Sequence, residues 1–259
     1  MKRVAIIQAR MSSSRLRGKV LEPLLGIPMI VFMLRRVERA SHLDHILVAT
    51  SIDKSDDMLA EVVRQNGFDC FRGSLEDVLS RYAAAADRNK ADVIVRLTGD
   101  CPLVDPDLID KCLTTLADGM YDYVSNIDPP SFPNGLDVEA FTGAALHSAN
   151  SEAQLPADRE HVTSFIRRNK AVFRGANFRS CVDLSHLRWT VDHADDLDFV
   201  RYLLQSVRGR ELVHADRFDF LRAQEQHIGV LPKNVHSRYE SYTDDGIEAL
   251  TAEKRKEKF

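Results

Sequence analysis

The sequence lacks the signature motifs of three large enzyme classes. It has no G-x-x-x-x-G-K-[ST] motif, because Gly18-Lys19 is followed by Val20 and has no upstream glycine at the required spacing. It has no G-x-G-x-x-G and no G-x-S-x-G motif. These absences disfavour a P-loop NTPase, a dinucleotide-dependent dehydrogenase and an α/β-hydrolase.

Cysteine, basic excess and long apolar runs are also scarce. The 259 residues include 4 cysteines without a C-x-x-C pair, at positions 70, 101, 112 and 181, which predicts reduced thiols in a cytoplasmic protein. The net charge is −4, which argues against a nucleic-acid partner. No run approaches the ~18 apolar residues that span a bilayer, and the first apolar run is too short for a signal peptide. We therefore expect no membrane partner.

Over the first 120 residues, apolar runs of strand length alternate with helical patterns. We predict strands at 4–7, 45–49, 69–71 and 92–97. We predict helices at 29–40, 55–65, 74–87 and 106–119, with a capping box at Ser74-x-x-Asp77 and an N-cap at Asp105. Such alternation is typical of an α/β fold with a mostly parallel sheet.

The pattern changes after residue 121. We predict strands at 121–125, 137–141 and 188–191, and helices at 142–153, 158–169 and 195–207. The loop at 126–136 contains three prolines and a glycine and is predicted to be either a lid or a plain connection. The whole chain, 1–259, is predicted to be one domain with an insertion at about 126–186 and a helical extension at about 208–259.

A cationic loop follows the first predicted strand. No acidic residue occurs in it before Glu22. Its polar residues are Arg10, Ser12, Ser13, Ser14, Arg15, Arg17 and Lys19. Guanidinium groups, an ammonium group and hydroxyls suit a ligand with several phosphates. The alternative is an ordinary solvated loop.

Two aspartates end predicted strands. Asp100 follows Gly99 in the stretch RLTGDCPLVDP, and Asp192 follows the predicted strand 188–191. Ligands of open parallel sheets bind beyond the carboxyl ends of the strands, so these carboxylates could face the cationic loop. Carboxylates opposite a triphosphate imply a shared Mg²⁺ ion. The alternative for Asp100 is a simple turn residue, and a metal role for His193 is disfavoured.

The motifs, taken in order, resemble a known family. They are Gln8-Ala9-Arg10, Ser14-Arg15-Leu16, Gly18-Lys19-Val20-Leu21, Arg96–Leu103, Gly135–Glu139, Arg159–Thr163 and Arg188–Asp192. Together they resemble the sugar-acid cytidylyltransferases, in the branch named for the spore coat polysaccharide biosynthesis protein SpsF. The resemblance extends from residue 3 to about residue 205.

The resemblance implies a Rossmann-like nucleotidyltransferase fold, CTP as the donor, Mg²⁺ as the cofactor and a homodimer that forms through the segment 126–186. It implies Lys19, Arg15 and Asp100 as catalytic residues, and Asp100 and Asp192 as metal ligands. The expected nucleotide-binding residues are Gln8, Ala9, Arg10, Ser12, Ser14, Arg15, Lys19, Arg96, Thr98 and Gly99. The expected acceptor-binding residues are Asn126, Asp137, Glu139, Arg159 and His161.

The motifs leave the identity of the acceptor open. Thr98 stands where the Kdo and sialic-acid branches usually carry Gln or Asn. An acidic sugar is the first expectation, and a sugar phosphate or a phosphonate is the alternative. A non-catalytic nucleotide-binding homologue and a metal-dependent glycosyltransferase, with Asp105-Pro106-Asp107 as its metal motif, are the rival functions.

Overall fold

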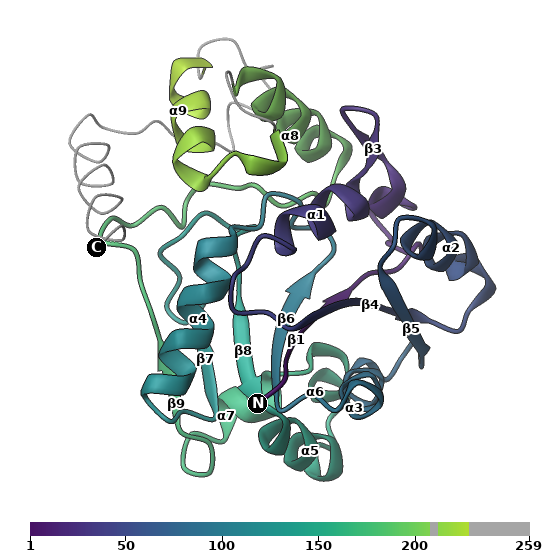
Figure 1. The fold of residues 1–259 in the computed structure, drawn as a ribbon, viewed down its shortest axis with the longest axis vertical. Coiled ribbons are helices and arrows are strands. Elements are labelled where there is room, and N and C mark those ends of the chain that lie inside the picture. The colour runs from purple at the N-terminus through teal and green to yellow at the C-terminus, as the bar shows by residue number, and fades with distance from the viewer. Residues whose placement is uncertain (208–211, 228–259) are drawn as a thin grey trace.

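The computed structural model describes residues 1–207 and 212–227. A seven-stranded sheet forms its centre, in the order β5-β4-β1-β6-β8-β7-β9 (Figure 1). The first four of these strands are mutually parallel: β5 (Asp69–Gly73), β4 (His45–Ser51), β1 (Arg3–Gln8) and β6 (Val93–Thr98). The other three are β8 (Glu139–Thr142), β7 (Tyr123–Ser125) and β9 (Gly175–Asn177), of which β8 runs antiparallel to both of its neighbours. The predicted α/β class and mostly parallel sheet are confirmed.

Helices cover both faces of the sheet because its central strands are apolar on both sides. On β1, Ala5 and Ile7 pack in the hydrophobic cluster that includes α1 (Met29–Val37), α2 (Asp57–Gln65) and α4 (Pro106–Asp118). Val4 and Ile6 point the other way, into the cluster with α3 (Val78–Asn89) and α5 (Gly143–Glu152). This alternation with a period of two residues places one strand between two cores.

The remaining elements are short or lie near the ends of the described chain. A separate two-stranded sheet joins β2 (Pro23–Leu24) to β3 (Ile27–Pro28). The other helices are α6 (Pro156–His161), α7 (Ser164–Arg168), α8 (Ala194–Ser206) and α9 (Arg217–His227), with 3-10 turns at Lys19–Leu21, Lys54–Asp56 and Leu212–His214. The predicted insertion, 126–186, contributes β8 and β9 to the main sheet. Of the predicted helical extension, α9 lies within the described residues, and residues 208–211 and 228–259 lie outside them.

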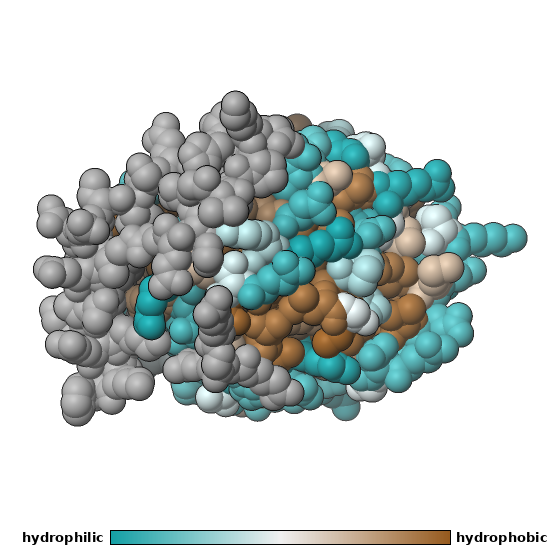
Figure 2. Space-filling view, turned by 90° about the horizontal axis from the view of Figure 1, so that it is seen from above, coloured by the Kyte–Doolittle hydropathy of each residue, from teal (hydrophilic) through white to brown (hydrophobic). Residues whose placement is uncertain are grey.

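The end of the molecule that carries α8 and α9 is shown from above in Figure 2. Hydrophobic residues gather there in a band between hydrophilic ones. Apolar surface of this kind is common on folded proteins, since polar groups do not suffice to cover them. Among the described residues, no helix is both long and apolar enough to cross a bilayer.

Three predicted elements differ in the structure. The helix predicted from residue 74 begins at Val78, because Asp77 and not Ser74 is its N-cap: the Asp77 carboxylate accepts the Ser80 amide at 2.9 Å. The predicted helix 158–169 is divided into α6 and α7 at Val162, which has φ 57° and ψ −59°. There the Thr163 amide donates to the His161 carbonyl at 2.5 Å, forming a classic γ-turn that interrupts the helical hydrogen bonds.

The third difference is the predicted strand 188–191. It is buried as expected, but its ladder pairing amounts to a single isolated bridge between Asn134 and Arg188. An apolar run indicates burial, whereas a strand also needs a neighbouring strand to pair with. The segment is therefore a buried extended connection rather than part of the sheet.

Candidate functional site

The candidate site lies at the carboxyl ends of β1 and β6. These strands are adjacent, and Gln8 at the end of β1 pairs with Thr98 at the end of β6. A cavity of about 250 Å³ opens beyond them. Its walls are Gln8, Ala9, Arg10, Ser13, Ser14, Arg15, Lys19, Val20, Val78, Arg81, Thr98, Gly99, Asp100, Glu160, His161 and Asp192. This is the crevice in which open parallel sheets bind ligands.

Two glycines allow the loops to close around this cavity. The Gly99 amide donates to the Gln8 carbonyl at 2.8 Å, and a Cβ atom at position 99 would lie only 2.9 Å from the Ala9 Cβ. Gly18 has φ +75°, and its amide donates to the Met11 carbonyl at 2.9 Å. The second contact folds the cationic loop back on itself, and Lys19 follows directly at the start of the 3-10 turn.

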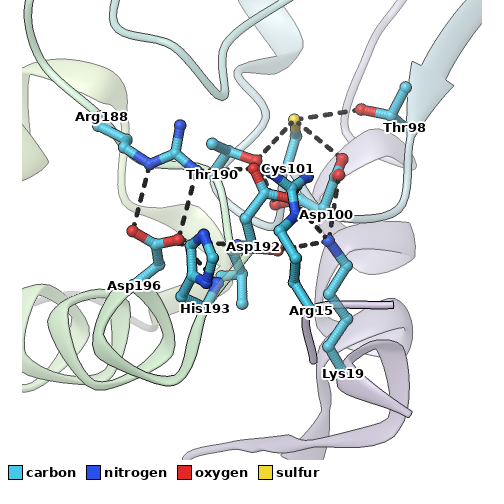
Figure 3. Close-up of polar contacts among 11 residues, drawn as sticks. Arg15, Lys19, Thr98, Asp100, Cys101, Arg188, Thr190, Asp192, His193 and Asp196 are labelled. Carbon is cyan, nitrogen blue, oxygen red and sulfur yellow. Dashed lines mark hydrogen bonds and ion pairs between the residues drawn. The ribbon is translucent and has the colours of Figure 1, made fainter. Parts of the chain in front are cut away.

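Lys19 joins the two aspartates that the sequence singled out. Its Nζ donates to Asp100 Oδ2 at 3.3 Å, to Asp192 Oδ1 at 3.1 Å and to the Val191 carbonyl at 2.7 Å (Figure 3). The Lys19 side chain is only 8% exposed, so water screens these contacts weakly. Residues that are as many as 173 positions apart in the sequence thus form one charged cluster.

Asp192 is held from its other side by Arg188. The Arg188 guanidinium donates to Asp192 Oδ2 at 2.6 Å and to Asp196 Oδ1 at 3.2 Å, and Arg15 donates to Asp192 Oδ1 at 2.9 Å (Figure 3). Partial burial alone would raise the pKa of Asp192, but the hydrogen bonds from Arg188 and Lys19 outweigh it and lower that pKa. Asp192 is therefore ionised at neutral pH.

The donor set fits a magnesium ion that shares its ligands with a substrate. Asp100 and Asp192 each place a carboxylate oxygen within 3.3 Å of the same Lys19 nitrogen. No cluster of three or more His, Cys, Asp or Glu residues suited to a metal occurs within residues 1–207 and 212–227. Mg²⁺ is commonly bound by one or two carboxylates together with substrate phosphates and water. Two carboxylates beside a cationic loop match that pattern.

The structure places most of the predicted nucleotide-binding residues on the cavity wall. The exceptions are Ser12, which is exposed outside the wall, and Arg96, which lies behind it. Arg96 donates to Gln8 Oε1 at 3.2 Å and forms an ion pair with Glu139. Arg81 also lines the cavity, is 3% exposed and was not predicted from the sequence. The sequence feature that could have revealed it is a basic residue on the apolar face of a predicted helix.

Two of the predicted acceptor-binding residues are buried and cannot contact a ligand directly in this arrangement. Asn126 closes its own loop, since its amide donates to the Leu136 carbonyl and accepts the Val138 amide, both at 2.8 Å. Glu139 is 3% exposed and accepts hydrogen bonds from the Tyr123 and Thr163 hydroxyls at 2.7 Å. The expectation of direct contact is therefore corrected: Asn126 holds its own loop, and Glu139 pairs with Arg96 behind the cavity wall.

Of the other three, His161 lines the main cavity and Arg159 lines a neighbouring one of about 290 Å³. The two cavities share Arg10, Val78 and Glu160. The Arg159 guanidinium donates to Asp77 at 2.6 Å, which attaches α6 to the start of α3.

Asp137 is exposed to solvent, although protein surrounds part of the residue. This partial withdrawal from water, together with the negative charges of Glu139 and Asp100, raises the pKa of Asp137 to about 6. Asp137 lines neither of these two cavities, although the charge of Asp100 reaches it.

Cys101 does not have the environment of a nucleophile. Its thiol is buried beside Thr98 Oγ1 at 3.3 Å and Thr190 Oγ1 at 3.9 Å. Burial and then the charge of Asp100 raise the pKa of Cys101 well above its usual value. The four cysteines, all within the described residues, form no disulfide with one another, as the sequence predicted.

Comparison with known proteins agrees with this arrangement. Residues 4–240 match the family model described as cytidylyltransferase. The chain is 34% identical over 220 residues to the spore coat polysaccharide biosynthesis protein SpsF of Bacillus subtilis, covering 81% of this chain and 89% of that protein. It is 36% identical over 118 residues to a 3-deoxy-manno-octulosonate cytidylyltransferase of Geobacter metallireducens, covering 45% of each protein.

Among solved structures, a cytidylyltransferase from Leptospira borgpetersenii superimposes with a TM-score of 0.84 and 30% identity. The match covers 90% of this chain and 98% of that one. The family model, SpsF and this solved structure each match most of the chain. This chain belongs to the cytidylyltransferase family and is a nucleotidyltransferase.

Proposed function

We propose that this chain is a Mg²⁺-dependent cytidylyltransferase that transfers CMP from CTP to an acidic sugar and releases pyrophosphate, as a step in surface polysaccharide biosynthesis. One observation carries the proposal: a cationic loop and two aspartates, Asp100 and Asp192, meet in a single cavity at the ends of β1 and β6. Family membership supports CTP as the donor. A cytoplasmic location and a homodimer stay predictions.

In this proposal the cationic loop binds the triphosphate. Arg10 and Arg15 are exposed at the cavity wall, where their guanidinium groups can hold phosphate oxygens bidentately. Ser14 lines the same cavity and adds a neutral hydroxyl donor. Lys19 adds a compact positive charge from the base of the cavity.

The reaction is a displacement at phosphorus. An oxygen of the acceptor attacks the α-phosphorus of CTP, and the bond between that phosphorus and the β-phosphate oxygen breaks. Pyrophosphate departs with the bonding electrons, and the proton of the acceptor hydroxyl passes to solvent. A bound Mg²⁺ ion would neutralise negative charge on the phosphates. Asp100 and Asp192 would hold the ion, and Arg15 and Lys19 would stabilise the charge that develops on the leaving group.

The acceptor is proposed to bind near His161 and Asp137, with Arg159 in the adjoining cavity. The 3-deoxy-manno-octulosonate cytidylyltransferases among the relatives support an acidic sugar. The Arg159 guanidinium is already paired with Asp77. The alternative acceptor is a sugar phosphate or a phosphonate.

The test is pyrophosphate release with Mg²⁺ from each of CTP, UTP, ATP and GTP against a panel of acidic sugars, sugar phosphates and phosphonates. We expect release with CTP and an acidic sugar. Release with a different nucleotide would refute the donor assignment, and release with a phosphorylated acceptor alone would refute the acceptor class. In the same assay Asp118→Asn is the matched control for Asp100→Asn, because it removes an exposed carboxylate at the end of α4 that is not part of the cavity wall.

A further inference from the structure

The surroundings of the Lys19 ammonium resemble those of a bound cation. It lies among three oxygen atoms, from Asp100, Asp192 and the Val191 carbonyl, at 3.3, 3.1 and 2.7 Å. An ammonium group has three N–H donors, and three acceptors therefore satisfy all of them. None of its donors is left for a phosphate while it stays in this position.

The charges of the surrounding cluster are already balanced. Three cations, Arg15, Lys19 and Arg188, contact three carboxylates, Asp100, Asp192 and Asp196 (Figure 3). A divalent ion that entered this partly buried cluster alone would add two uncompensated positive charges. A divalent ion that arrives with a triphosphate brings its own negative charge.

We propose that Lys19 acts as a built-in counter-ion: its ammonium occupies the place between Asp100 and Asp192 where the divalent ion binds, so that the ion and Lys19 exclude each other. The nucleotide releases this block, because its phosphates attract the ammonium away from the two aspartates. The inference rests on the proposed function and deepens it, since it predicts that metal binds with the nucleotide and not before it.

The geometry allows Lys19 to have both positions. Its backbone is anchored at the start of the 3-10 turn, where the Glu22 amide donates to the Lys19 carbonyl at 3.1 Å. Its flexible side chain of four methylene groups can still redirect the charge toward the cavity that it lines. Asp192 keeps its orientation during the exchange, because Arg188 holds its other oxygen at 2.6 Å.

The experiment measures binding of Mn²⁺, as a probe for the divalent ion, by calorimetry or by electron paramagnetic resonance. Titrations are made with the full chain alone and with a non-hydrolysable CTP analogue. The variant Lys19→Met removes the ammonium and keeps an unbranched side chain, and Lys19→Gln serves if the first variant does not fold. Arg10→Met is the matched control, because it removes one positive charge from the same cavity wall.

Without nucleotide, Lys19→Met should bind Mn²⁺ about tenfold or more tightly than the wild-type chain, because one charge-assisted competitor is gone. Arg10→Met should change that affinity by less than about threefold, since an exposed charge is screened by salt. In the wild-type chain the CTP analogue should tighten Mn²⁺ binding, and by linkage Mn²⁺ should tighten analogue binding by the same factor.

Two results would overturn the inference in distinguishable ways. If Lys19→Met leaves Mn²⁺ affinity unchanged, lowers it, or raises it no more than Arg10→Met does, then Lys19 is not the competitor, although the metal site itself stands. If the wild-type chain binds no Mn²⁺ even with the nucleotide analogue, then the metal site of the proposed function fails, and the inference fails with it.

Discussion

Glu139 neutralises the charge of Arg96, which contacts the cavity wall of the candidate site from behind. Its carboxylate is 3% exposed and is paired with Arg96, whose side chain is 14% exposed and also contacts Gln8 at the end of β1. Burial by itself would raise the pKa of Glu139, but the positive charge of Arg96 and the hydroxyls of Thr163 and Tyr123 lower it. The pair is therefore ionised.

Glu139→Gln should be strongly destabilising. It keeps the size of the side chain and an acceptor for the two hydroxyls, but it leaves the Arg96 cation without a counter-charge. Breaking one side of a buried ion pair costs about 3–5 kcal/mol, and the partial exposure of Arg96 favours the lower end, about 3 kcal/mol. This is a large fraction of the ~5–15 kcal/mol that stabilises a typical protein.

The assay is urea unfolding of four proteins: the wild type, Glu139→Gln, Arg96→Met and the double variant. Removing both charges together should be far less damaging than the sum of the single changes, with a coupling free energy of at least about 2 kcal/mol. Single-variant losses that add within about 0.5 kcal/mol would refute the reasoning, because independent sites behave in that way.

Three further predictions concern the site. Asp100→Asn should abolish turnover while leaving the circular dichroism spectrum and melting temperature near wild type; a near-normal rate would remove Asp100 from the reaction. Gly135→Ala should lower the free energy of unfolding by about 3 kcal/mol or more, since φ is +113° and the new Cβ would lie 2.6 Å from the Trp189 carbonyl carbon; a neutral effect in a urea titration would contradict this geometry. The pKa of Asp137 is raised to about 6, so its charged form is disfavoured in the fold. The stability that its protonated form contributes is fully present below the ordinary pKa near 4 and is lost as pH rises through 6. Asp137→Asn should thus stabilise the protein by about 1 kcal/mol at pH 8, after discounting for exposure, and have almost no effect at pH 4; equal melting-temperature shifts at both values would refute the titration.

The sequence alone was sufficient for the central strands and for the cationic loop. Val4–Ile7 is continuously apolar and the run at 93–97 is apolar apart from Arg96, and such runs predict strands that are buried on both faces. The glycine before Asp100 and the cap at Asp105 are local signals as well, and the Asp105 carboxylate does accept the Asp107 amide at 3.0 Å. Local signals can be read because they depend only on near neighbours in the chain.

The tertiary structure decided which of the charged residues face the cavity and which support it. Arg96 and Glu139 occupy strand positions that any pattern assigns to a sheet, but only the antiparallel pairing of β6 with β8 makes them partners. The γ-turn at Val162 likewise interrupts a pattern that reads as continuous helix. Whether a polar side chain faces a ligand or another side chain depends on contacts between distant segments.

The meeting of Asp100 with Asp192 shows the same division. The sequence singled out both carboxylates, yet the segment before Asp192 is no strand, and sheet register does not position it. Instead Trp189 is buried in the core, the Val191 amide donates to the Asp100 carbonyl at 2.8 Å, and Gly135 leaves room for the chain to pass. Residue types and their local periodicity thus determined which chemical groups are present. Packing between segments nearly a hundred residues apart determined that these groups share one cavity. The physical reason is that shape complementarity between distant segments is not encoded in any short stretch of sequence.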